Sequence, residues 1–392
     1  MEQTNNYRRP RRSNMEQNRS TQGYWLAVLL IVFIIFCDLL GILSPDRSFS
    51  DNENRNLAQA PTFSTDALLD GSYFAGWEDY IADQFFARDF WITLRLKCAK
   101  FFGQKESNGV YLGKDDYLIQ IPTEPDWKNV DATLAAVNDF TQRHEELKVN
   151  MMIVPNAVSI LADKLPTNAP GRNQNADLKY IRNALDGVTF LDPTAALSKH
   201  SSEPLYYRTD HHWTSLAASY AFSATAKAMG IGKVSQGYDV YTVSNSFEGT
   251  LASKSGDHST RDVIEIYVPK NATDYRVTYG DTQEKICSLY KRDCLFEKDQ
   301  YTVFFGGNHP KVTIETTVDC GKTLLLFKDS YANCYVQFLY PYYDEIVMID
   351  PRYFYDNIES VITRESVTDV LFLYNADTFL SDTSLKDVLT VE

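Results

Sequence analysis

The stretch TLLLFKDSY at residues 323–331 decides the fold, because an apolar strand pattern runs directly into Asp329, Ser330 and the start of a helix. A side chain at such a junction lies at the carboxyl end of a parallel strand, beside the free N–H groups and positive end of the new helix. We therefore predict that Ser330 is a nucleophile whose own N–H stabilises an oxyanion, and that Tyr331 contacts the substrate. The alternative is that Asp329 or Ser330 only caps the helix.

Strands and helices alternate through most of the chain beyond residue 110. The pattern predicts a hairpin from 110–112 and 117–119, strands at 150–154, 188–191, 301–305, 323–327, 345–349 and 369–374, and helices at 131–147, 177–185, 214–229 and 331–339. Such alternation is typical of an α/β fold with a mostly parallel sheet flanked by helices. Residues 231–300 are less regular, and we predict an insertion or a small strand-rich flap there.

An apolar run at residues 24–43 is long enough to cross a bilayer, and Asp38 interrupts it only near one end. Five arginines precede the run, so the positive-inside rule places the N-terminus in the cytoplasm. A cleaved signal peptide is the alternative, but GILSPDR at residues 41–47 offers a poor cleavage site. We therefore predict an uncleaved single-pass anchor in the cell membrane.

This topology divides the chain into four parts. Residues 1–23 form a basic cytoplasmic tail, 24–43 the transmembrane anchor, 44–105 a linker and helical neck, and 106–392 an extracytoplasmic domain. The neck pattern predicts one helix from Ser72 to Phe102 with an apolar face. The net charge is −14, and residues 1–23 hold five Arg and two Glu, so the rest of the chain is near −17. Such an acidic chain excludes nucleic acid as a partner, because nucleic acid requires a basic surface.

Six cysteines occur, one of them inside the apolar run. The sequence contains no CxxC motif and no Cys/His cluster with zinc spacing, so we expect no metal site. Cys287 and Cys294 are near enough in sequence to close a small disulfide loop, but spacing alone does not decide their pairing.

A second chemical motif is YYRTDHHW at residues 206–213. If this segment is extended, Asp210 and His212 share one face and His211 points to the other. A carboxylate beside an imidazole fixes its tautomer and stabilises the imidazolium, as catalytic acid–base pairs require. Trp213 is a further candidate for substrate contact. The alternative is a simple helix start, capped by Asp210 or Thr214, with Trp213 as a packing residue.

Two further sites follow predicted strands. In FGGNHP at residues 305–310, Gly307 permits close backbone approach, and the Asn308 amide can donate to an oxyanion. The alternative for this motif is an ordinary glycine-rich turn. Arg352 can bind an anionic or hydroxylated ligand, or it can form a structural ion pair.

Taken together, the DHHW, KDSY and GGNHP motifs resemble the DHHW protein family, which is similar to the alginate O-acetylation proteins of the AlgJ/AlgX type. NENRNLAQAP at residues 52–61 and VYLGKDDYL at residues 110–118 fit the same pattern. The resemblance covers about residues 50–375. It implies an SGNH-hydrolase-like fold in which the Asp-His motif precedes the serine, and a catalytic triad of Ser330, His212 and Asp210, with no cofactor.

The resemblance also implies a function. We expect a membrane-anchored, extracytoplasmic serine-dependent O-acyl (acetyl) transferase or esterase that acts on a cell-surface glycan or wall polymer. A membrane-bound O-acyltransferase is the expected partner and acyl donor. One alternative is a non-catalytic, membrane-tethered glycan-binding or assembly protein with a vestigial triad. A metal phosphoesterase of the DHH type is a weaker alternative, because the chain lacks the further Asp-rich segments that such chemistry needs.

Overall fold

The computed structural model describes residues 13–232, 234, 237–271 and 273–390. Its contacts divide the chain into two compact units, one ending at Arg95 and one beginning at Leu96.

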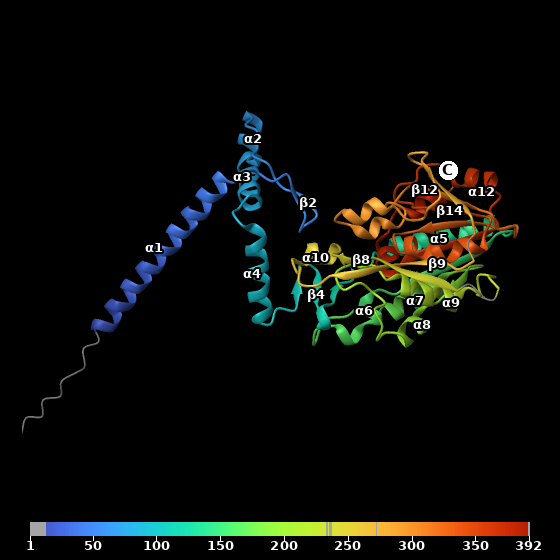
Figure 1. Ribbon diagram of the computed structural model, residues 1–392, viewed down its shortest axis with the longest axis horizontal. Helices are drawn as coiled ribbons and strands as arrows, with labels where there is room; N and C mark the ends of the chain where they lie inside the picture. Colours follow the sequence, from blue (N-terminus) through green and yellow to red (C-terminus); the bar gives the residue numbers. More distant parts are fainter. Residues whose placement is uncertain (1–12, 233, 235–236, 272, 391–392) are drawn as a thin grey trace, which may run out of the picture. The chain divides into compact units, whose positions relative to one another are not determined.

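The second unit is built on an eight-stranded sheet in the order β11-β10-β12-β14-β13-β15-β6-β7 (Figure 1). The strands are β6 Lys148–Val154, β7 Thr189–Leu191, β10 Tyr275–Tyr279, β11 Lys285–Ile286, β12 Lys311–Thr316, β13 Thr323–Lys328, β14 Glu345–Ile349 and β15 Asp369–Asn375. The five from β14 to β7 run parallel, whereas β12, β10 and β11 add to one edge in antiparallel fashion. The predicted α/β fold with a mostly parallel sheet is confirmed.

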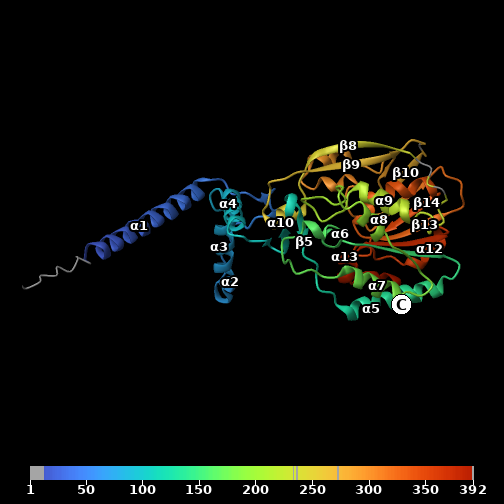
Figure 2. The same cartoon turned by 90° about the horizontal axis from the view of Figure 1, so that it is seen from below.

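Helices cover both faces of this sheet (Figure 2). On one face lie α6 Ala157–Ile160, α8 Thr194–Lys199, α9 Ser215–Thr225 and α11 Tyr331–Leu339, and on the other α5 Trp127–Arg143, α7 Gln174–Ala184, α12 Ile358–Arg364, α13 Ala376–Ser381 and α14 Leu385–Leu389. Leu324 and Leu326 of β13 face the first layer, and Leu325 and Phe327 face the second. This burial on both sides explains the unbroken apolar run of β13.

Residues 231–300 contribute to two different sheets. β8 Tyr238–Phe247 and β9 Asp262–Pro269 form a separate antiparallel pair around α10 Thr250–Ser255, whereas β10 and β11 extend the main sheet. A third small sheet contains β3 Glu106–Ser107, β4 Val110–Leu112 and β5 Leu118–Gln120. Its β4–β5 pair confirms the predicted hairpin.

Several predicted elements differ from the structure, among them the helix predicted at 131–147, which spans Trp127–Arg143. The predicted strand at 301–305 is wrong, since residues Gln300–Val303 form a 3-10 turn. Phe305, Gly306 and Gly307 then adopt positive φ angles of 63°, 79° and 107°, which no strand accommodates. The helix predicted at 214–229 is shorter and ends at Thr225. All six cysteines lie in the described residues and have free thiols, so the pairing of Cys287 with Cys294 is not formed.

The first unit begins with α1, Ser13–Leu43, followed by the short strands β1 Phe49–Ser50 and β2 Arg55–Asn56. Among the described residues, α1 is the one helix long and apolar enough to cross a membrane, over Gln22–Gly41. Then follow α2 Thr65–Asp70, α3 Ser72–Asp83 and α4 Arg88–Phe101. The single helix predicted from Ser72 to Phe102 is therefore two helices. The chain breaks at Ala87, whose φ of 53° no α-helix contains.

Candidate active site

Ser330 lies between the end of β13 and the start of α11, with helical φ and ψ of −64° and −17°. Its side chain does not cap the helix. The preceding residue does so instead, because Asp329 Oδ1 accepts the Tyr331 N–H at 2.9 Å. Asp329 Oδ2 accepts the backbone and side-chain N–H groups of Asn375, at 2.9 and 2.6 Å. The carboxylate of Asp329 thus fixes the turn between neighbouring strands and leaves the Ser330 hydroxyl free for other contacts.

The segment that carries Asp210 and His212 is a tight loop. A bridge between Tyr206 and Trp213 closes it, and the Tyr207 N–H donates to the His212 carbonyl at 3.2 Å. Asp210 Oδ1 accepts the His212 backbone N–H at 2.9 Å and lies 2.5 Å from His212 Nδ1. The segment is therefore not extended, although Asp210 and His212 do meet. A local turn, rather than strand alternation, brings them together.

The three predicted triad side chains meet in space. His212 Nε2 lies 2.7 Å from Ser330 Oγ, across 118 residues of sequence. His212 and Asp210 are buried, and Ser330 is half-buried. These distances link a hydroxyl, an imidazole and a carboxylate in one row, which is the geometry that acid–base activation of a serine requires.

A second loop holds the carboxylate of Asp210. Its Oδ2 accepts the Thr250 N–H at 2.8 Å and the Thr250 hydroxyl at 2.9 Å. Burial by itself raises the pKa of Asp210, but the charges of His211 and His212 and the hydrogen bonds from His212 and Thr250 outweigh it. They hold the pKa well below its ordinary value. Asp210 therefore stays ionised and can stabilise a protonated His212.

His211 lies beside the triad instead of pointing away from it. Its ring centroid is 4.0 Å from that of His212, and its Nδ1 is 2.9 Å from Thr250 Oγ1. Burial, reinforced by His212, lowers the pKa of His211 to about 4, so its ring is neutral at neutral pH. Asp210, His211 and His212 also offer ligand atoms within 4.8 Å of one another, a spacing compatible with a metal ion. Both carboxylate oxygens of Asp210 already accept hydrogen bonds, which favours a proton relay.

Tyr301 is a site residue that the sequence did not reveal. Its ring stacks on His212 at a centroid distance of 3.8 Å and an interplanar angle of 15°. Its hydroxyl donates to the Ser330 carbonyl at 3.1 Å. One buried side chain therefore holds both the imidazole and the turn that carries the hydroxyl. These contacts join three distant segments, so no local pattern predicts them; Gly249 and Thr250 were missed for the same reason.

The GGNHP motif leaves the side-chain amide of Asn308 free to donate a hydrogen bond. Asn308 Oδ1 accepts from Lys328 Nζ at 2.8 Å and from Asn333 Nδ2 at 3.3 Å. Because these donors fix the oxygen of the amide, its NH₂ group points away from them and is available to a ligand. The N–H of Gly307 is already bonded to the Phe304 carbonyl at 3.2 Å. Of the two predicted contacts in this motif, only Asn308 retains a donor.

Trp213 and Tyr331 serve packing in this structure, and their predicted contact with substrate stays a prediction. Both side chains are fully buried. Trp213 Nε1 donates to the Tyr331 carbonyl at 2.9 Å, and its ring stacks on Tyr331 and Tyr335. The Tyr331 hydroxyl donates to the His211 carbonyl at 2.6 Å. The two residues thus join the DHHW loop to α11.

Arg352 forms a structural ion pair, which is the second of the two readings that the sequence allowed. Its guanidinium binds both carboxylate oxygens of Asp350, at 2.8 and 2.6 Å. Asp350 is fully buried and lies 3.4 Å from Lys328 Nζ. Asp350 thus pairs with both Arg352 and Lys328, and binding of a ligand by Arg352 stays a prediction.

The serine follows a parallel strand, and its Asp-His pair lies on a loop earlier in the chain. This arrangement is that of an SGNH-hydrolase-like domain in which the Asp-His motif precedes the serine motif. Residues 110–303 match the family described as the SGNH hydrolase-like domain of the acetyltransferase AlgX. This range contains Asp210 and His212 and ends before Ser330. The predicted resemblance to this group of proteins is confirmed.

Solved structures are similar to a larger share of the chain than the family match covers. A DHHW family protein from Eubacterium siraeum is 27% identical, with a TM-score of 0.62, over 73% of this chain and 98% of that one. PatB1 from Bacillus cereus has the same fold at 18% identity and a TM-score of 0.58, over 70% of this chain and 98% of that one. The O-acetyltransferase domain of Pseudomonas putida AlgJ is 15% identical, with a TM-score of 0.45, over 71% and 99%. No curated protein sequence matches the chain.

Proposed function

We propose that this protein is a membrane-anchored, extracytoplasmic O-acyltransferase that moves an acyl group, most simply acetyl, through Ser330 onto a cell-surface glycan or wall polymer. The observation that carries the proposal is the hydrogen-bonded row from Ser330 Oγ through His212 to Asp210. The match to an acetyltransferase family supports the choice of acyl group.

In the first half of the reaction, Ser330 Oγ attacks the acyl carbonyl carbon while its proton passes to His212 Nε2. Asp210 stabilises the imidazolium that forms. The Ser330 N–H has no acceptor within the described chain, so it is free to donate to the oxyanion, together with the Asn308 amide. Collapse of the tetrahedral intermediate releases the leaving group with the proton from His212, and an acyl-serine remains.

In the second half, a hydroxyl of the acceptor gives its proton to His212 and attacks the acyl-serine. The new ester leaves, and Ser330 recovers its proton from His212. If water attacks instead, the same site acts as an esterase. The protein groups that take part in these steps all belong to the second unit.

The apolar helix α1 supports the proposed location. With the basic tail in the cytoplasm, the second unit lies outside the membrane, where glycan acceptors are. Acyl groups are made in the cytoplasm, so a membrane-bound O-acyltransferase is the partner expected to deliver them.

The nucleophile is tested with the full-length protein in detergent micelles. PatB1 has been solved with a sulfonyl adduct, so an arylsulfonyl fluoride is a suitable probe. We expect one adduct on Ser330 and turnover of p-nitrophenyl acetate, both lost in Ser330→Ala and both kept in Ser201→Ala. If wild type and Ser330→Ala behave alike, the vestigial-triad alternative replaces this proposal.

Transfer is separated from hydrolysis in cells. A strain that carries Ser330→Ala in place of the wild-type protein should lose ester-linked acyl groups from its surface glycan. Loss of the membrane-bound acyltransferase should have the same effect. If glycan acylation rises in the Ser330→Ala strain, the protein is an esterase.

A further inference from the structure

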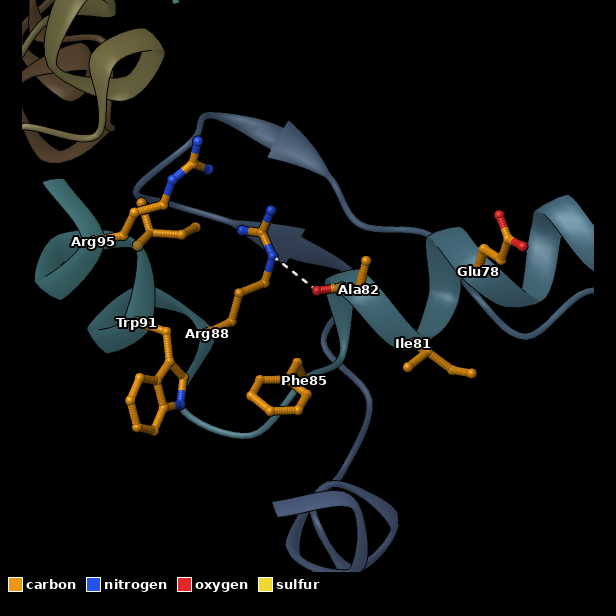
Figure 3. A pocket seen from close by; sticks show the side chains of 8 residues that line it. Glu78, Ile81, Ala82, Phe85, Arg88, Trp91 and Arg95 are labelled. Carbon is orange, nitrogen blue, oxygen red and sulfur yellow. Dashed lines mark hydrogen bonds between the residues drawn. The ribbon is translucent and has the colours of Figure 1, made fainter. Parts of the chain in front are cut away.

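An apolar groove of about 520 Å³ lies along α3 and α4 of the first unit. It is lined by Glu78, Ile81, Ala82, Phe85, Arg88, Trp91, Ile92 and Arg95. Figure 3 shows Arg88 and Arg95 extending toward the β1–β2 hairpin, while Trp91 and Ile81 extend to the other side. The groove thus has a charged side and an apolar side.

Further large apolar residues near the break are exposed. Phe86, Phe90 and Leu94 recur at four-residue spacing, and they are 37%, 58% and 39% exposed. Ile81 on α3 is 55% exposed. A stripe of large apolar side chains open to water is costly, so it indicates a surface that is covered in the native setting.

The break between α3 and α4 packs directly on α1. The Trp91 ring lies 5.7 Å from that of Phe33, and a Cβ on Gly41 would approach the Gln84 carbonyl oxygen and the Phe86 nitrogen within 4 Å. Cys37, between these two contacts, is only 2% exposed. All of these α1 residues lie inside the apolar stretch Gln22–Gly41.

The contact with α1 determines how deep Trp91 lies in the bilayer. Phe33 precedes Gly41 by eight residues, which at the helical rise amounts to about 12 Å along α1. Half of a bilayer's hydrocarbon core is roughly 15 Å thick. If α1 spans the bilayer, Trp91 therefore lies at the level of the acyl chains of the non-cytoplasmic leaflet.

Several polar groups near the break are bonded within the chain, as an apolar medium requires, whereas Asp89 Oδ1 is buried without a partner among the described residues. The Trp91 Nε1 donates to the Phe86 carbonyl at 3.1 Å, and the N–H groups of Phe90 and Trp91 both donate to the Ala87 carbonyl. Arg88 binds Glu53 and Asp83 and donates to the Ala82 carbonyl. Its charge is thus neutralised on the hairpin side, away from Trp91.

We propose that the α3–α4 break is a second membrane-embedded element, and that phospholipid acyl chains of the non-cytoplasmic leaflet fill the groove. The inference rests on the proposal that α1 spans the membrane. It adds that the chain both crosses the bilayer and lies in its outer half. This arrangement restricts the tilt of α1.

The test uses the full-length protein in phosphatidylcholine–phosphatidylglycerol vesicles that contain a phosphatidylcholine with a diazirine in its acyl chain. After photolysis, labelled peptides are mapped by mass spectrometry. We expect labels on residues 81–94 as well as on α1. Phe296 and Tyr355, which are 81% and 92% exposed in the second unit, serve as unlabelled internal controls. In Phe86→Ser/Phe90→Ser/Leu94→Ser, labelling of the break should fall to the level of these controls, while α1 stays labelled.

The other outcomes distinguish this inference from the proposed function. Labels on α1 but not on residues 81–94 of the wild type overturn the inference and leave the anchor intact. If lipid labels are absent there and an added bifunctional cross-linker joins the breaks of two chains, the groove belongs to a second copy and the inference is also overturned. If α1 is unlabelled, the anchor and the inference fail together. Turnover of p-nitrophenyl acetate, followed in the same vesicles, reports separately on Ser330.

Discussion

The carboxylate of Asp210 accepts hydrogen bonds from the backbone and ring of His212 and from the backbone and hydroxyl of Thr250. Every one of these donors comes from two short loops, so the position of the carboxylate depends on the fit between them. Because these hydrogen bonds fix the carboxylate of Asp210, the activity of the site should depend both on its charge and on its position.

Loss of the charge is tested by Asp210→Asn. The amide cannot stabilise a protonated His212 and favours the wrong tautomer, so we expect kcat for p-nitrophenyl acetate to fall by about 10³–10⁴-fold with the fold retained. Circular dichroism and the thermal midpoint check that the variant is folded. A fall of less than tenfold would mean that Asp210 does not support His212 in catalysis.

Displacement is tested at Gly249, which packs against Asp210. Its φ and ψ of −89° and −171° suit any residue, but a Cβ there would lie 2.6 Å from Asp210 Cγ and closer still to Asp210 Cβ. We expect Gly249→Ala to lower kcat by about 100-fold, because shifts near 1 Å have effects of that size. Gly171→Ala, where nothing lies within 4 Å, is the matched control and should retain full activity. Equal rates in both variants would contradict the geometry.

At the scale of elements, the antiparallel edge of the main sheet contains a pair of like charges. Glu345 at the start of β14 lies directly opposite Glu315 of β12. Burial, together with the charges of Glu365 and Glu315, raises the pKa of Glu345 from 4.5 to about 7. Like charges opposite each other on neighbouring strands destabilise a sheet.

This pair predicts a pH dependence of stability. Folded Glu345 keeps its proton to higher pH than the unfolded chain does, so stability falls as the pH rises from 4.5 through about 7. Glu345→Gln removes this loss. Its thermal midpoint should exceed that of the wild type by about 1–3 °C above the folded pKa and match it below the unfolded value. Calorimetry across this range, with the exposed Glu145→Gln as control, should show the difference only for Glu345→Gln.

The sequence predicted elements well where one local signal dominates. Residues 331–339 form the predicted helix, and 345–349 the predicted strand, because a sharp junction or a buried apolar run marks each. The strand expected at 301–305 was wrong because Tyr301 stacks on His212 and the segment forms a 3-10 turn instead of alternating across a sheet. The break at Ala87 was missed because the apolar spacing continues through it.

In the candidate site, too, the sequence predicted the residues that carry a local motif and missed those that depend on distant contacts. Asp210, His212 and Ser330 could be predicted because each carries its own motif, and the structure brings them together. Trp213 and Tyr331 carry equally clear motifs but are buried, and a motif does not reveal exposure. Tyr301, Gly249 and Thr250 act through contacts between distant segments, which a single sequence cannot show.

At the scale of the whole molecule, the second unit has its own core and supplies every residue of the proposed triad. Leu96 of α4 belongs to this unit and packs with Val110, Leu112, Leu118, Leu251 and Ala252. We expect a chain beginning at residue 88 to fold and to turn over p-nitrophenyl acetate at the full-length rate. It should not acylate glycan in cells, because it lacks the anchor.

A chain beginning at residue 105 provides the comparison. It lacks Leu96, and loss of such a buried leucine lowers the free energy of unfolding by about 2–4 kcal/mol. Urea unfolding of the two chains measures this difference. Equal stability would show that α4 contributes nothing to the second unit.

The order of strands in the main sheet has a consequence for biosynthesis. β15, the last strand made, lies between β13 and β6 and so joins the two halves of the sheet. Its final residue, Asn375, holds the carboxylate of Asp329 next to Ser330. Until β15 is in place, the turn that carries Ser330 therefore lacks these hydrogen bonds. A chain cut short before residue 369 lacks this strand, so prematurely terminated products leave the ribosome without an assembled nucleophile.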